Sequence, residues 1–403
     1  MKKKLSLVLA LLLALSVFAA ACGGKKADEP AKDDAVVDEP AEDAEEPAED
    51  AEEPADVEEE PADDAEEPAD DASSDEELHI EVVSKGLQHA FWVNVQNGCQ
   101  QAADDSGATM NFDGPASESD IQDQVNMLEN AITKNPDAIC LAALDVQSVM
   151  TSLENAKSAG IPIIGFDSGV PGAPEGTVFA NASTDNNAAG ALAAENLFEA
   201  VKDEVEAASA DAQVRIAVLS QDAASESIMG RTEGFIDKMK ELVGEDNVAV
   251  VGSTVYADGD EAAASVVLDV GIPAKVDNAD SDATANALLE KDGVIAIYAS
   301  NEFAAESMIR AGNDLGGVLG NRAEDDTKIW AVGFDAGAVQ KAAVLDGTLL
   351  GSITQDPVQI GYKAVELAIQ AAKGESVEDV DTGAKWYNAE NLSDPDIDVL
   401  IYE

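Results

Sequence analysis

In the long C-terminal part of the chain, the apolar positions alternate between two patterns. Continuous apolar runs such as 138–144 and 161–166 are typical of strands in a parallel sheet, because both faces of such a strand are covered. Between these runs the apolar residues follow a helical period: Ile121, Val125 and Leu128 lie on one side of a helix. This alternation predicts parallel α/β structure with right-handed crossovers.

The same two patterns predict the positions of further elements. Strands are expected at 79–84, 108–112, 138–144, 161–166, 214–219, 248–255, 294–299 and 329–333. Helices are expected at 91–106, 120–134, 225–243, 303–311 and 338–346, with one more from Val149 that ends at Gly160. About ten strands exceed one small sheet, so the predicted fold is α/β with two doubly wound parallel-sheet lobes.

The N-terminal segment has the features of an export signal. Lys2, Lys3 and Lys4 precede an apolar run from Leu5 to Ala21, which is short for a membrane span and ends in small residues. Ala19-Ala20-Ala21-Cys22 resembles a bacterial lipobox. We therefore expect a lipoprotein signal peptide at 1–21 and lipidation of Cys22, with an ordinary signal peptide and an incidental cysteine as the alternative.

An acidic segment follows at 22–77. Residues 25–77 hold 27 acids and three lysines, and prolines recur every seven residues at positions 40, 47, 54, 61 and 68. No apolar seam accompanies the seven-residue period, and a proline interrupts each would-be heptad, so a coiled coil is excluded. Low hydrophobicity and dense like charge predict a disordered tether that holds the folded part away from its anchor.

The charge of the whole chain narrows the function classes. The sequence holds 82 acidic and 23 basic residues, a net charge of −59, and this excess would repel nucleic acids and anionic lipid head groups. Only two histidines are present, and no nucleophile elbow or phosphate-binding glycine loop follows a predicted strand. We therefore predict that the chain is not an enzyme and has no cofactor or metal, which leaves a binder of neutral ligands open.

Polar residues stand where ligands bind in α/β sheets, just past the carboxyl ends of strands. Asp167, Asn301 and Asp335 each follow a predicted strand, and Arg231 lies in the helix after the strand at 214–219. Each alone would more often be a helix cap or a solvated surface group. Together, carboxylates, an amide and a guanidinium suit the hydroxyl groups of an uncharged polyol.

Two adjacent aromatic residues, Phe91 and Trp92, begin the first predicted helix in a chain that is only 4% aromatic. Core packing would explain one of them. Aromatic faces also stack on sugar rings, so the pair is a candidate for ligand binding. His89 could donate to a ligand hydroxyl, and Lys85 could reach the same site, although a solvated lysine is the more common case.

Residues 78–403 resemble the ribose-binding-protein type of periplasmic sugar-binding proteins, which are the substrate-binding lipoproteins of ABC transporters. The resemblance rests on the order and spacing of seven segments: Phe91-Trp92, Ile163–Asp167, Ala182–Asn186, Gly230–Phe235, Ser300–Glu302, Val332–Asp335 and Thr354–Pro357. It implies that Phe91 and Trp92 sandwich a sugar ring with an aromatic residue from the other lobe. It also implies hydrogen bonds to the sugar from Asp167, Arg231, Asn301, Asp335 and Gln355.

Three positions depart from the family pattern. Ser168 stands where an arginine is usual, and Gly259 stands where the far-lobe aromatic residue is expected, with Tyr256 as a possible substitute. The usual asparagine before the aromatic pair is replaced around Gln88-His89. These changes remove a guanidinium and a stacking ring, so the expected ligand is a monosaccharide, pentose or hexose, rather than D-ribose in particular.

The resemblance further implies a three-strand hinge and a mode of action. We expect an N-lobe at 78–184 and 356–383, and a C-lobe at 185–355 and 384–403. We expect a monomer on the outer face of a cell membrane of Gram-positive type, with the lipid anchor as its only membrane contact. It is expected to hand its sugar to the permease subunits of an ABC importer with a cytoplasmic ATPase. A nucleoside or furanone ligand, and delivery to a sensor kinase or chemoreceptor, stay open as alternatives.

Two minor features complete the sequence. Cys99 and Cys140 fall in the first helix and third strand of one lobe; we expect two buried free thiols, and a disulfide is the alternative in an exported protein. Asp277, Asp280 and Asp282 invite a calcium site, but no glycine and distal glutamate accompany them at the spacing of a calcium loop.

Overall fold

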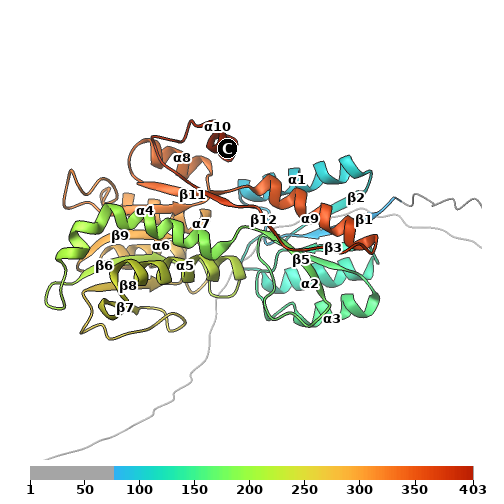
Figure 1. The fold of residues 1–403 in the computed structure, drawn as a ribbon, viewed down its shortest axis with the longest axis horizontal. Helices are drawn as coiled ribbons and strands as arrows, with labels where there is room; N and C mark the ends of the chain where they lie inside the picture. The colour runs from blue at the N-terminus through green and yellow to red at the C-terminus, as the bar shows by residue number, and fades with distance from the viewer. Residues whose placement is uncertain (1–76, 403) are drawn as a thin grey trace, which may run out of the picture. The chain divides into compact units, whose positions relative to one another are not determined.

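Two sheets organise residues 77–402, which are the part of the chain that the computed structural model describes (Figure 1). The predictions for the signal peptide, Cys22 and the acidic segment up to residue 76 lie outside the described residues. Each sheet belongs to one lobe and is covered by helices on both faces. The predicted class, α/β with two doubly wound parallel-sheet lobes, is confirmed.

The sheet of the first lobe has six parallel strands in the order β12-β5-β4-β3-β1-β2. Helices α1 and α9 cover one face, and α2 and α3 cover the other (Figure 1). The strands are β1 (His79–Val83), β2 (Thr109–Asp113), β3 (Ala138–Leu141), β4 (Ile163–Phe166), β5 (Val178–Ser183) and β12 (Val380–Asp381). The helices are α1 (Ala90–Ser106), α2 (Ile121–Thr133), α3 (Met150–Ala159) and α9 (Pro357–Ala372).

The sheet of the second lobe has seven strands in the order β13-β11-β10-β9-β6-β8-β7, parallel except for β13. Helices α4 and α5 pack on one face, and α6, α7 and α8 on the other. The strands are β6 (Val214–Leu219), β7 (Val248–Val251), β8 (Val266–Gly271), β9 (Val294–Ala299), β10 (Trp330–Phe334), β11 (Gly351–Gln355) and β13 (Ala384–Tyr387). The helices are α4 (Asn186–Ala207), α5 (Glu226–Val243), η1 (Glu245–Asn247), α6 (Asn278–Leu289), α7 (Glu302–Asp314), α8 (Ala338–Leu345) and α10 (Pro395–Asp398).

The chain passes between the two sheets three times: between β5 and α4, between β11 and α9, and between β12 and β13. Two of these connections are joined by hydrogen bonds. The Thr184 hydroxyl donates to the carbonyl of Gly383 at 3.1 Å, and the backbone N–H of Asp185 donates to the carboxylate of Asp381 at 3.1 Å. The three connections therefore run side by side as a hinge between the two lobes.

One expected strand is shorter than its apolar run. The strand predicted at 138–144 ends at Leu141, although Ala142, Ala143 and Leu144 are also buried. The side chain of Gln124, from α2, takes over the role of a neighbouring strand: it donates to the Ala142 carbonyl at 2.8 Å and accepts from the Leu144 N–H at 2.9 Å. A buried loop is therefore possible here because its backbone groups are satisfied.

Close helix pairs built on glycine occur in both lobes. A side chain at Gly98 of α1 would put its Cβ 2.0 Å from the Val358 carbonyl of α9, and one at Gly361 would meet the Val95 carbonyl at 2.0 Å. In the second lobe, Gly190 and Gly234 play the same part between α4 and α5, with Cβ contacts of 2.1 Å. Since the obstacles are backbone atoms, only glycine permits these helices to lie so close.

Cys99 and Cys140 are buried free thiols, as expected, and burial raises the pKa of both. Asp277 caps α6 by accepting from the Asp280 N–H at 2.9 Å, and Asp282 pairs with Arg310 of α7 at 2.9 Å. These acids therefore stabilise α6 and its contact with α7. Within residues 77–402, none of the helices combines the length and the apolar composition that crossing a membrane requires.

Candidate functional site

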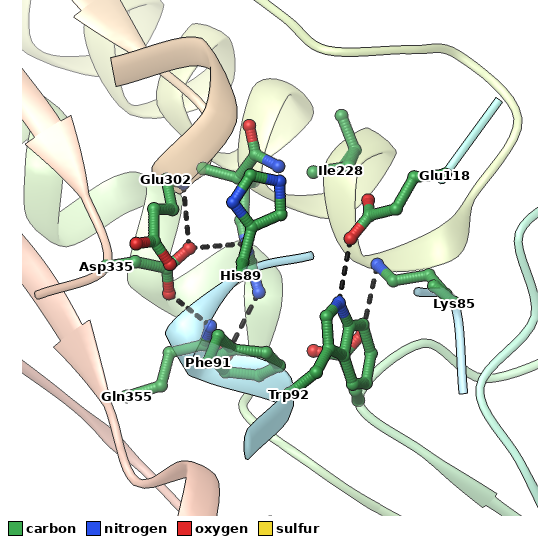
Figure 2. A pocket seen from close by; sticks show the side chains of 12 residues that line it. Lys85, His89, Phe91, Trp92, Glu118, Ile228, Glu302, Asp335 and Gln355 are labelled. Carbon is green, nitrogen blue, oxygen red and sulfur yellow. Dashed lines mark hydrogen bonds and ion pairs between the residues drawn. The ribbon is translucent and has the colours of Figure 1, made fainter. Parts of the chain in front are cut away.

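All nine candidate ligand residues line one cavity (Figure 2). They are Lys85, His89, Phe91, Trp92, Asp167, Arg231, Asn301, Asp335 and Gln355. The first five belong to the first lobe and the other four to the second lobe. Segments that are far apart in the sequence thus meet at the carboxyl ends of both sheets, as open α/β folds require.

Two aspartates occupy matching places in the two lobes. Asp167 directly follows β4 and Asp335 directly follows β10, and both are buried. Their backbones are left-handed, with φ of 55° and 74°. This conformation is uncommon for a residue with a side chain and tends to occur at functional sites, where the surrounding structure holds it. Each strand therefore ends in a turn that aims a carboxylate into the cavity.

The carboxylate of Asp167 is paired with a buried lysine. The Nζ of Lys85 lies 2.9 Å from Asp167 Oδ2 and donates to the Ser227 hydroxyl of the second lobe at 3.0 Å. Burial lowers the pKa of Lys85, but the carboxylates of Asp167 and Glu118 outweigh burial and raise it. Lys85 is therefore a fixed cation at the cavity wall rather than the solvated lysine that its position in the sequence would suggest.

Arg231 joins the polar groups of the second lobe. Its guanidinium donates to the side chain of Asn186 at 2.9 Å, to the Ser300 carbonyl at 3.3 Å and to the side chain of Gln355 at 2.9 Å. It stacks on the ring of Phe334, with Cζ 4.0 Å from the ring centroid. These contacts fix the plane of the guanidinium beside the cavity, so its N–H groups keep one orientation.

Asp335 lies at the centre of this group. Its carboxylate accepts from Gln355 Nε2 at 2.7 Å and from the backbone N–H of Glu302 at 2.9 Å, and the guanidinium of Arg231 lies 4.0 Å away. Burial raises the pKa of Asp335, and the charge of Arg231 opposes this rise. Asn301 caps α7 by accepting from the Ala304 N–H at 3.0 Å and still reaches the cavity.

The aromatic side of the cavity belongs to the first lobe. Phe91 and Trp92 are both buried and pack edge to face, with ring centroids 5.0 Å apart. The apolar residue that the second lobe contributes to the cavity is Ile228, on α5. Tyr256 is half-buried against the core of the second lobe and is not among the lining residues, so it does not replace the missing far-lobe ring.

The glycine at the position of that ring has a structural reason. Gly259 has a φ of 80°, and a Cβ there would lie 2.9 Å from the Val248 carbonyl. The neighbouring Asp258 pairs with Val250 through two backbone hydrogen bonds of 2.8 and 3.0 Å. This segment therefore packs along β7, and an aromatic residue has no place in it.

Three lining residues were not predicted: Glu118, Ile228 and Glu302. Glu118 lies in the loop before α2, where no strand end points to it. Ile228 follows the helical pattern of a core residue. Glu302 was part of the segment Ser300–Glu302 that carries the family resemblance, but its own role was not considered. For Glu302, its place beside Asn301 after a strand is the signal that could have found it.

Glu302 is a buried carboxyl group, and its Oε2 has no hydrogen-bond partner within the described residues. Burial, followed by the charges of Asp335 and Glu306, raises its pKa from 4.5 to about 8. Near neutral pH this side chain therefore carries a proton. The protonated carboxyl group can donate a hydrogen bond at the cavity wall, beside Asp335.

A pH-dependent stability follows from Glu302. Between its ordinary pKa and about 8, the native state holds a proton that the unfolded chain has released, so rising pH disfavours the native state. Relative to E302Q, we expect the wild type to lose roughly 1.4 kcal/mol per pH unit over that range. Urea unfolding of both proteins at several pH values between 5 and 8 measures this difference. Parallel pH profiles for the two proteins would contradict the protonated state.

Within residues 77–402, His, Cys, Asp and Glu side chains form no group of three or more that could hold a metal ion. The acids of the cavity instead face cations or neutral donors: Asp167 faces Lys85, and Asp335 faces Arg231 and Gln355. Donors and acceptors lie side by side next to an aromatic wall. The arrangement suits reversible binding of a small ligand with many hydroxyl groups.

Comparison with known proteins gives matches over most of the described residues. A model of the periplasmic binding protein domain matches residues 80–376. The ribose import binding protein RbsB of Salmonella typhimurium is 26% identical over 304 residues, which are 74% of this chain and 86% of that protein.

Two solved structures are also similar. A protein from Brachyspira murdochii described as "ABC transporter, LacI family transcriptional regulator" is 40% identical, with a TM-score of 0.69 over 81% of this chain and 99% of its own. An ABC transporter solute binding protein from Agrobacterium vitis with bound D-fucose is 30% identical, with a TM-score of 0.67 over 80% of this chain and 100% of its own. The chain therefore belongs to the periplasmic binding protein domain family, and its relatives there are sugar-binding proteins of ABC transporters.

Proposed function

We propose that this protein captures a monosaccharide, a pentose or hexose, in the cavity lined by both lobes and delivers it to an ABC importer. The observation that carries the proposal is the convergence of Asp167, Asp335, Arg231, Asn301 and Gln355 beside Phe91 and Trp92.

The bonding pattern in the cavity supports a polyhydroxylated, uncharged ligand. Lys85 is paired with Asp167, and Arg231 lies 4.0 Å from Asp335, so the lysine and the arginine of the cavity each have an acid that balances their charge. A sugar hydroxyl both donates and accepts, and can enter between such pairs without an unbalanced charge. A nucleoside base would need a second aromatic face, and the second lobe offers Ile228.

Sugar binding would act through closure of the lobes. Lobe bounds of 78–184 with 356–383, and 185–355 with 384–403, put the two half-sites on opposite sides of the hinge. A ligand that contacts both half-sites stabilises the closed form, because only that form makes all the contacts. The closed, loaded protein would then dock on the permease subunits as a monomer.

The proposal includes attachment to the outside of the cell membrane. The basic, apolar and small-residue parts of 1–22 support export and lipidation at Cys22, and the acidic segment supports a role as spacer. A lipid anchor with two acyl chains is sufficient for stable attachment. The binding lobes would then work next to the importer without a membrane span of their own.

A thermal-shift screen tests the proposed ligand class. The wild-type protein is heated with millimolar D-ribose, D-allose, D-fucose, D-arabinose, inositols and nucleosides in turn. A sugar at 100 times its Kd should stabilise the protein by about 2.7 kcal/mol. D335N, which removes the negative charge beside Arg231 and leaves one oxygen where Gln355 Nε2 and the Glu302 N–H now have two, is the control in which the shift should vanish. If no monosaccharide raises the melting temperature of the wild type, the proposal fails.

A further inference from the structure

Glu118 is a buried carboxylate at the boundary between the lobes, outside the two turns that carry Asp167 and Asp335. Glu118 lies in the loop between β2 and α2 of the first lobe, and Gln221 follows β6 of the second lobe. Gln221 Nε2 donates to Glu118 Oε2 at 3.0 Å. The two residues are only 9% and 1% exposed. This bond is therefore shielded from water and joins the lobes at the cavity itself.

The hydrogen bond between Gln221 and Glu118 is the middle one of three consecutive side-chain hydrogen bonds. On one side, Trp92 Nε1 donates to Glu118 Oε1 at 2.8 Å (Figure 2). On the other side, Asn301 Nδ2 donates to Gln221 Oε1 at 2.6 Å. Trp92 and Asn301, the first and last residues of this series of hydrogen bonds, are candidate sugar contacts on opposite lobes. Glu118 and Gln221 therefore connect one half-site to the other.

The charge of Glu118 decides how these groups are oriented. Burial raises the pKa of Glu118, but the charges of Lys85 and His89 and the N–H of Trp92 outweigh burial and lower it. An ionised carboxylate only accepts hydrogen bonds. Gln221 must therefore turn its N–H₂ toward Glu118, which leaves its carbonyl oxygen for Asn301.

We propose that Glu118 is a positioning residue of the binding site, which fixes Trp92 directly and Asn301 through Gln221 when the lobes close. This inference rests on the proposed sugar-binding function. Because Glu118 and Gln221 lie on different lobes, opening the hinge must break the bond between them. The bond therefore adds to the stability of the closed form and, through it, to ligand affinity.

The test compares E118Q in two backgrounds, the wild type and Q221A. An amide at position 118 has only one oxygen, so either Trp92 Nε1 or Gln221 Nε2 must then face another N–H group. In the wild-type background, E118Q should weaken binding about 10- to 100-fold, the effect of one buried donor without an acceptor. In the Q221A background the amide can turn its N–H₂ into the space left by Gln221. There, E118Q should cost less than about 3-fold.

Titration calorimetry with D-ribose, D-allose and D-fucose measures the affinities, and small-angle scattering of the same samples measures closure. E129Q, at a half-buried position of α2 where the amide oxygen can still accept from Asn155 Nδ2, controls for the loss of one negative charge and should bind like the wild type. In the proposed mechanism the ligand-free protein is open and lacks this bond, so the melting temperatures of the ligand-free variants should stay close together.

The possible outcomes separate the two proposals. Equal losses from E118Q in both backgrounds would overturn the positioning role and leave the sugar-binding function intact. Loss of stability in the ligand-free protein that matches the loss of affinity would reduce Glu118 to a structural residue. A wild-type protein that binds none of the three sugars, or any other monosaccharide, would overturn the function and the inference with it.

Discussion

R231M is expected to reduce sugar affinity by about 100- to 1,000-fold, the effect of leaving a buried charge without its partner. Arg231 is 2% exposed and contacts Asn186, Ser300, Gln355 and Asp335. Its removal leaves the carboxylate of Asp335 without a cation and Gln355 Oε1 without a donor. Titration calorimetry with the sugar that gives the largest thermal shift measures the loss.

Two companion variants make this result specific. R231K keeps the charge but loses the planar fork that reaches several partners at once, so an intermediate loss is expected. R310M removes a surface arginine that pairs with Asp282, and its affinity should match that of the wild type. Melting curves establish that each variant is folded before binding is measured. Binding by R231M within a few-fold of the wild type would refute the central role of Arg231.

G98A is expected to destabilise the first lobe by roughly 3 kcal/mol, at the upper end of the usual cost of overpacking a core. The added Cβ would lie 2.0 Å from the Val358 carbonyl, so α1 and α9 must move apart. Both helices cover the sheet that carries β1 and β4, and the ends of those strands lead to Lys85 and Asp167. Urea unfolding compares the variant with the wild type.

Q100A provides the matched control on the exposed side of the same helix. Its side chain bonds only Asp104, one turn away, and the substitution should change stability by no more than about 0.5 kcal/mol. If G98A unfolds at the same urea concentration as Q100A, the helices have more freedom than the glycine contact implies. Loss of stability in G98A alone would establish the close helix pair as a requirement of the fold.

Apolar continuity explains which elements were predictable. The strand at 294–299 has the predicted bounds because its side chains are apolar and it is buried on both faces. β11 was not predicted, because Ser352, Thr354 and Gln355 read as a polar segment although all three are buried. Their polar atoms are satisfied by partners from elsewhere, such as the Asp335 carbonyl for Ser352 and the Leu400 carbonyl for Thr354.

Helix α4 was missed for a different reason. Its first half is rich in alanine, and small residues give only a weak contrast between the buried and exposed sides. Gly190 within it would count against a helix by propensity, yet it is the point of contact with α5. Tertiary packing therefore overrides the local preference at this residue.

The sequence by itself determined the class of fold, the places of its apolar strands and the residues that follow them, since these depend on local periodicity and on the geometry of parallel sheets. Only the tertiary structure decided what those residues touch: that Lys85 pairs with Asp167, that Glu118 reaches Gln221 across the lobes, and that Ile228 faces the aromatic pair. Such contacts join segments that are distant in the sequence, 142 residues apart in the case of Lys85 and Ser227, and no local pattern encodes the distance between them.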